Sequence, residues 1–287
     1  MIIEMFNFWY FFWIAASVGV FIALYFLLRG KREQIQSAVL FSLLAFALIL
    51  HFLKAFIPPY STDHSRWLRD SWFVNICGAN IALFPFLFLS KSKTAKDYMF
   101  YIGILGGLVA IFLPLEPIKK LDQASELLDV IRFYVHHNIL WYVPLLMVML
   151  KIHTLDYKRV WKIPGCFMLL LLFIMLNQIL QSELGFVPLR GDDITAIGYK
   201  NTSYIWGPDD EISKIITPLC PNIFKTIPVG KLAGTPKYWP WFWLLVPAHV
   251  VLIPLCFLMS MIFEHKHFKT DILSIRSRFI KPRQNHN

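Results

Sequence analysis

The chain has 287 residues, of which 57% are hydrophobic and only 16% are charged. In a soluble domain about a quarter of the residues are charged. A chain this apolar has too few polar residues to cover its surface in water, so we expect it to lie in lipid. This composition excludes a cytosolic enzyme. The net charge of +10 would suggest nucleic-acid binding in a soluble protein. Here the basic residues lie between apolar runs, so we interpret them as topology signals and expect no nucleic-acid partner.

Seven apolar runs are long enough to cross a bilayer. A hydrocarbon core about 30 Å thick requires roughly 20 residues at 1.5 Å each, and lipid cannot satisfy an open backbone, so each run is expected to be a helix. The predicted fold is therefore all-α, a single integral membrane domain over residues 1–287 built as a seven-transmembrane-helix bundle. In chain order the runs cover residues 5–28, 37–57, 72–90, 98–114, 131–151, 163–182 and 240–263.

The basic residues predict how this bundle is oriented. More than half of the 28 Lys and Arg residues follow the first, third, fifth and seventh runs in short segments. Short segments rich in Lys and Arg face the cytoplasm. We therefore expect a multi-pass protein of the cell membrane with its N-terminus outside and its C-terminus in the cytoplasm.

Two further segments lie between or beyond the runs. Residues 183–239 hold six prolines and several apolar patches, which is unlike a disordered linker. We expect an extracytoplasmic cap between the sixth and seventh helices. Residues 264–287 form a basic cytoplasmic tail, which is expected to touch anionic lipid.

Polar residues of several runs converge on one depth. Counting from the ends of the runs at 1.5 Å per residue places these residues roughly 8–9 Å below the outer surface of the hydrocarbon core. Polar side chains are energetically costly at this depth, so their presence there indicates a functional site. Such a site would be reachable from the lipid glycerol region, so its natural substrate is a lipid ester. The residues are His51 and Lys54, Cys77 and Asn80, His136, His137 and Asn138, Asn177 and Gln178, with His249 somewhat deeper.

Within this layer Cys77 is the strong nucleophile, and histidine is the side chain that can take its proton near neutrality. Amides such as those of Asn80, Asn177 and Gln178 could stabilise an oxyanion. His136 and His137 diverge by about 100° on a helix, so one of them is a supporting residue. Each residue also has a structural explanation: buried cysteines are often inert, polar side chains join helices, and lysine can snorkel. Glycines 103, 106 and 107 are expected to allow close helix approach.

Three short stretches follow one another along the predicted helices: Asn75-Ile76-Cys77, Leu113-Pro114, and the run from Tyr134 to Pro144 that contains His136 and His137. In this order and spacing they resemble the YwaF and transmembrane protein 164 family, with a further match at Asn201-Thr202-Ser203-Tyr204. The resemblance implies a seven-helix membrane protein whose eukaryotic members move acyl chains between phospholipids and lysophospholipids without coenzyme A. It also implies that Cys77 carries the acyl group and that His137 is the histidine of the motif.

Three hypotheses follow. The first is a phospholipid acyltransferase, or a related lipid hydrolase, working through a thioester on Cys77 without a cofactor. The second is a transporter or receptor whose polar layer binds a small ligand. The third, a metal or haem site formed by His51, His136 and His249, is disfavoured because no two histidines have i, i+4 spacing within a span. We expect no metal.

Overall fold

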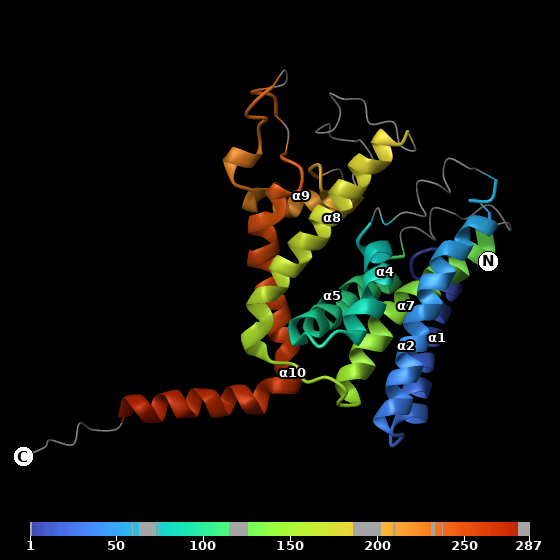
Figure 1. Cartoon of the computed structure of the whole chain (residues 1–287), viewed down its shortest axis with the longest axis vertical. Coiled ribbons are helices and arrows are strands. Elements are labelled where there is room, and N and C mark those ends of the chain that lie inside the picture. Colours follow the sequence, from blue (N-terminus) through green and yellow to red (C-terminus); the bar gives the residue numbers. More distant parts are fainter. Residues whose placement is uncertain are drawn as a thin grey trace, which may run out of the picture.

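The structure is a computed structural model that describes residues 2–58, 60–62, 73, 75–114, 126–185, 202–208, 211–230, 233–236 and 238–280. Over these residues the chain is all-α and contains no strand (Figure 1). Each of the seven predicted runs coincides with one long helix. The helices are α1 (Phe8–Leu28), α2 (Glu33–Leu53), α4 (Ile76–Leu89), α5 (Lys93–Phe112), α7 (Leu127–Met149), α8 (Ile163–Glu183) and α10 (Leu245–Ile280).

Five of these helices are long and apolar enough to cross a membrane: α1, α2, α5, α8 and α10. Helix α4 is apolar but has 14 residues, or about 21 Å at 1.5 Å per residue, which is short of a hydrocarbon core of about 30 Å. Helix α7 has 23 residues but carries Asp129, Arg132 and two histidines, and most of it is buried. The chain is therefore a multi-pass membrane protein in which α4 and α7 differ from the other long helices.

Helices α5 and α7 approach each other closely because two glycines on α5 face α7. A Cβ added at Gly103 would lie 2.5 Å from the carbonyl oxygen of Leu140, and one at Gly107 would lie 2.7 Å from that of His137. Only residues without a side chain allow two backbones this close. The predicted role is confirmed for these two glycines, whereas Gly106 faces open space.

Part of the predicted cap packs directly on the bundle. Trp206 and Trp243 are almost completely buried, and the indole N–H of Trp206 donates to Oε1 of Gln178 on α8 at 2.9 Å. The Trp241 N–H donates to the carbonyl oxygen of Ile205 at 2.8 Å, which ties the two ends of this segment together. The described residues of 202–244 therefore form an ordered layer beside the ends of α8 and α10 (Figure 1). The predicted cap residues 186–201 lie outside the described ones.

Helix α10 continues well past the predicted span end at residue 263 and bends. Phe257 and Phe268 are 11 residues apart, or about 16 Å along a straight helix, yet their ring centroids are 5.5 Å apart. The ring of Tyr157 contacts both of them. The predicted tail is thus helical to Ile280, and its helix turns away from the bundle (Figure 1). The charged residues beyond Phe263 end the apolar run but not the helix.

Candidate active site

Cys77 is the second residue of α4. The helix begins at Ile76 because the side chain of Asn75 caps it, accepting from the Gly78 N–H at 2.7 Å. The Ile76 N–H donates to Oγ of Ser203 at 3.2 Å, so the segment after α8 closes over the same turn. The prediction of a helix from residue 72, with Cys77 about five residues inside it, is therefore wrong. A thiolate at the second position faces the positive end of the helix dipole.

The helical period places Cys77 on the inner face of α4. Residues 77, 81, 84 and 88 share one face at about 100° per residue. Ile81, Phe84 and Phe88 are all buried on that face, while Cys77 is partly exposed at the helix end and packs against the main core. The thiol is therefore directed toward the bundle interior rather than toward lipid.

The contacts of Gly103 show that α4 and α7 approach the same part of α5. A Cβ at Gly103 would touch both the ring of Phe84 on α4 and the backbone of Leu140 on α7. From this contact, Cys77 lies about two turns toward the start of α4, and His137 lies about one turn toward the start of α7.

The two adjacent histidines have different hydrogen-bond partners. Nδ1 of His137 lies 2.8 Å from the carbonyl oxygen of Phe133, which can only accept, so Nδ1 carries the proton and Nε2 keeps its lone pair. Nδ1 of His136 lies 3.2 Å from Nη1 of Arg132, which can only donate, so in neutral His136 the proton is on Nε2. Of the pair, His137 therefore has the tautomer of a base acting through Nε2, and His136 that of a donor.

A group of buried polar side chains surrounds His136. The rings of His51 and His136 are stacked with centroids 6.1 Å apart, and Cε1 of His51 lies 3.4 Å from a Cβ built at Gly78, beside Cys77. The ammonium of Lys54 and the guanidinium of Arg132 both lie over the ring of Tyr60. Helices α2, α4 and α7 thus bring His51, Lys54 and His136 together at the start of α4.

The remaining predicted residues lie around this group or apart from it. The amide oxygen of Asn80 accepts from the hydroxyl of Tyr98 at 2.9 Å, and that of Asn138 accepts from the indole of Trp141 at 3.2 Å. Gln178 holds Trp206, as described above. The amide nitrogen of Asn177 is buried and has no hydrogen-bond partner among the described residues. His249 bonds to the carbonyl of Leu245 on its own helix and is partly exposed, so its ring is held locally.

Two charged residues of this group were missed by the sequence analysis. Asp129 precedes the predicted run 131–151, but α7 begins at Leu127 and buries it completely. Arg132 pairs with it at 2.6 Å and also contacts His136. The spacing Asp129, Arg132, His136 follows the helical period, so it could have indicated a polar face of α7. Ser203 was indicated only by the family resemblance at Asn201-Thr202-Ser203-Tyr204, and Phe73 carries no signal of its own.

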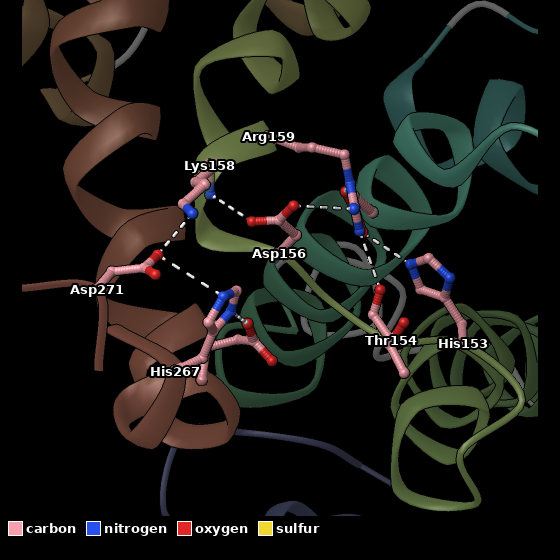
Figure 2. Close-up of polar contacts among 9 residues, drawn as sticks. His153, Thr154, Asp156, Lys158, Arg159, His267 and Asp271 are labelled. Atoms are coloured by element: carbon pink, nitrogen blue, oxygen red, sulfur yellow. Dashed lines mark hydrogen bonds and ion pairs between the residues drawn. The ribbon is translucent and has the colours of Figure 1, made fainter. Parts of the chain in front are cut away.

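A second polar network joins the start of α5, the segment between α7 and α8, and α10; Figure 2 shows part of it. The buried carboxylate of Asp97 accepts from Nε2 of His153 at 2.7 Å and from Nε of Arg159 at 2.5 Å. Nearby, Asp271 of α10 accepts from the Tyr157 hydroxyl at 2.6 Å and pairs with Lys158 at 2.5 Å. These contacts fasten α5 and the bent part of α10 to the segment between α7 and α8, which indicates a structural role.

Two of the other cysteines are more deeply buried than Cys77. Cys220 lies within the cap segment, and its burial raises the pKa of its thiol. Cys256 is completely buried on α10. Among the described residues, no group of three or more His, Cys, Asp or Glu side chains is arranged to hold a metal ion.

Comparison with known proteins identifies the family. The model of the TMEM164 family matches residues 5–260, which include all seven long helices up to the bend of α10. The chain belongs to the TMEM164 family. Neither curated proteins nor solved structures gave a match. The family match covers Cys77, both histidines of α7 and the segment around Ser203, so the candidate site lies within the part of the chain that TMEM164 family members share.

Proposed function

We propose that this TMEM164 family protein is a membrane-embedded phospholipid acyltransferase that works without coenzyme A through a thioester on Cys77. The observation that carries the proposal is the position of Cys77 at the start of α4. There the thiol lies at the positive end of a helix and packs against the main core, next to Gly78, which His51 approaches; His51 in turn stacks with His136 on the helix that carries His137. Because α4 is shorter than the hydrocarbon core, this position suits an ester of a membrane lipid.

The first half of the reaction transfers the acyl chain to the protein. Nε2 of His137 takes the thiol proton, and the sulfur attacks the ester carbonyl carbon of a phospholipid. The carbon–oxygen bond to glycerol then breaks, and the departing oxygen takes the proton from His137. The products are the Cys77 thioester and a lysophospholipid. The Nε2–H of His136, which has no partner among the described residues, is a candidate donor to the oxyanion.

The second half returns the thiol. His137 takes the proton of an acceptor hydroxyl, whose oxygen attacks the thioester carbonyl. The carbon–sulfur bond breaks, and the thiolate is reprotonated from His137. A lysophospholipid acceptor gives acyl transfer, and water gives hydrolysis. The two protein groups that exchange protons in this cycle, Cys77 and His137, belong to α4 and α7.

The proposed function includes a topology. We propose that all seven long helices cross or enter the bilayer, with the N-terminus outside, the 183–239 segment on the same side and the C-terminus in the cytoplasm. The bent part of α10 then lies along the cytoplasmic surface. It exposes Lys266 and Lys269 beside the apolar residues Ile272 and Ile275, a pattern that suits anionic lipid headgroups.

The test is incubation of the purified protein with a phospholipid labelled in its acyl chain. Wild type should acquire a label that hydroxylamine removes, and Cys77→Ala should not. The matched control is Cys256→Ala, which removes a buried thiol on α10 and should keep the label. His137→Ala should slow labelling by about 10²-fold or more, the contribution typical of a general base. Equal labelling of wild type and Cys77→Ala would refute the proposal, and binding without turnover would favour a receptor or transporter.

A further inference from the structure

An apolar trough runs between α4, α5 and α8, with a volume of about 510 Å³. This volume lies within the range of about 300–1,000 Å³ that is typical of small-ligand sites. Its walls include Ala79 and Ala82 of α4 and Ala95 of α5, whose small side chains leave the space that the trough occupies. Larger side chains border it, and they include Phe86, Leu169 and Phe173.

The trough opens sideways toward lipid. Phe86 and Leu169 are 67% and 66% exposed, and Phe173 is 48% exposed, so the rim lies on the outer surface of the bundle. Helices α5 and α8, which form two of the walls, are long and apolar enough to cross the membrane. A ligand in the trough is therefore reached from the bilayer rather than from water. A polar group of the ligand would find no hydrogen-bond partner along most of these walls, which disfavours polar ligands.

Two residues that line the trough contact residues of the candidate active site. Tyr98 lines the trough and donates its hydroxyl to Asn80, one turn below Cys77. Phe73 also lines it, and its ring stacks on that of His51 at 5.4 Å between centroids. The trough also reaches Ser92 and Thr94 at the start of α5. The trough thus leads from the polar group at the start of α4 along that helix toward its end.

We propose that this trough holds one fatty acyl chain of a membrane phospholipid, with the ester toward Phe73 and His51 and the methyl end toward Thr94. An unbranched alkyl chain matches a trough whose lining is mostly aliphatic and aromatic side chains, with Tyr98, Ser92 and Thr94 as its hydroxyl groups. The orientation of the chain rests on the proposed function, because it assumes that the ester is the reacting group. Occupancy by a chain does not depend on that assumption.

The experiment uses the full-length protein in liposomes of phosphatidylcholine that carries a diazirine midway along one acyl chain. After photolysis, peptide mass spectrometry maps the labelled residues. We expect the label to concentrate on the trough walls of α4, α5 and α8 in wild type and in Cys77→Ala. Ala82→Trp fills the trough and should reduce this label at least fivefold. The matched control is Ala15→Trp on the exposed face of α1, which should leave the label unchanged.

Two results would overturn the proposal. One is label spread evenly over lipid-facing residues such as Phe26 and Leu258 and unaffected by Ala82→Trp. The other is stronger labelling of the trough by a photoreactive sterol than by the phospholipid. If Ala82→Trp does not fold, the smaller change Ala95→Leu should reduce label near Thr94. Trough labelling without a hydroxylamine-sensitive adduct would refute the proposed function alone, whereas an adduct without trough labelling would refute this inference alone.

Discussion

Replacing single glycines of α5 by alanine tests whether the α5 and α7 backbones are in contact. At Gly103 a Cβ would lie 2.5 Å from the Leu140 carbonyl oxygen and 2.8 Å from the Phe84 ring. Since backbone cannot move aside as a flexible side chain can, the helices must separate. We take the upper end of the overpacking cost, about 3 kcal/mol. Alanine regains about 1 kcal/mol over glycine in a helix.

The net loss for Gly103→Ala is therefore about 2 kcal/mol. At about 2–4 °C per kcal/mol this lowers the Tm of the protein in detergent by about 4–8 °C. Gly106→Ala is the matched control, because it lies on the same helix and its Cβ would meet nothing within 4 Å. It should keep the Tm or raise it by about 2–4 °C through helix propensity alone.

The assay is thermal unfolding followed by tryptophan fluorescence, with Gly107→Ala as a third variant. Its Cβ would lie 2.7 Å from the carbonyl oxygen of His137, so it should also reduce formation of the Cys77 adduct at temperatures where the protein is folded. Equal Tm values for the Gly103→Ala and Gly106→Ala variants would refute the reasoning. The α5 and α7 backbones would then be too far apart for Gly103 to matter.

Three further predictions concern charge and protonation. Arg132→Met removes the guanidinium that pairs with the buried carboxylate of Asp129 at 2.6 Å, and it should lower the free energy of unfolding by about 3–5 kcal/mol. The double variant Asp129→Asn with Arg132→Met should have a higher Tm than Arg132→Met alone. A Tm equal to or lower than that of Arg132→Met would contradict the pairing. Nitrogen-15 NMR of labelled histidines should find the proton of His137 on Nδ1 and that of His136 on Nε2, and the same tautomer at both would contradict the assignment. Burial raises the pKa of Cys220, and only the thiolate form of a cysteine reacts with an alkylating reagent. The alkylation rate of Cys220 should therefore reach its plateau at a higher pH in the folded protein than in the unfolded chain. A plateau at a lower pH in the folded protein would be inconsistent with that shift.

The seven long helices could be predicted because lipid allows few alternatives for an apolar run. Their ends could not be predicted in the same way. The apolar run that contains α4 begins at residue 72, but the helix itself starts at Ile76 because Asn75 caps it. At α10 the apolar run stops near residue 263 while the helix continues to Ile280. Helix ends depend on capping and on contacts such as that of Tyr157 with the bend, which hydropathy does not record.

Part of the membership of the candidate site was predictable. Counting residues from the membrane boundary brought His51, Lys54 and His136 to one layer, and their rings and charges do lie together. Counting residues in this way could not find Ser203, whose hydroxyl oxygen accepts a hydrogen bond from the backbone N–H of Ile76, 127 positions earlier in the sequence. It also missed Asp97, whose partners His153 and Arg159 lie more than 50 positions away. Such pairs depend on how helices pack, which a single sequence does not specify.

The choice between His136 and His137 shows what helical geometry adds to residue identity. Each imidazole contacts the residue four positions before it, as the helical period requires. For His136 that residue is Arg132, whose side chain reaches Nδ1 as a donor. For His137 it is Phe133, which offers only its backbone carbonyl as an acceptor. The identity of the preceding residue thus sets which nitrogen is protonated. Adjacent histidines on one helix can in this way take opposite roles, one as a proton acceptor and the other as a donor.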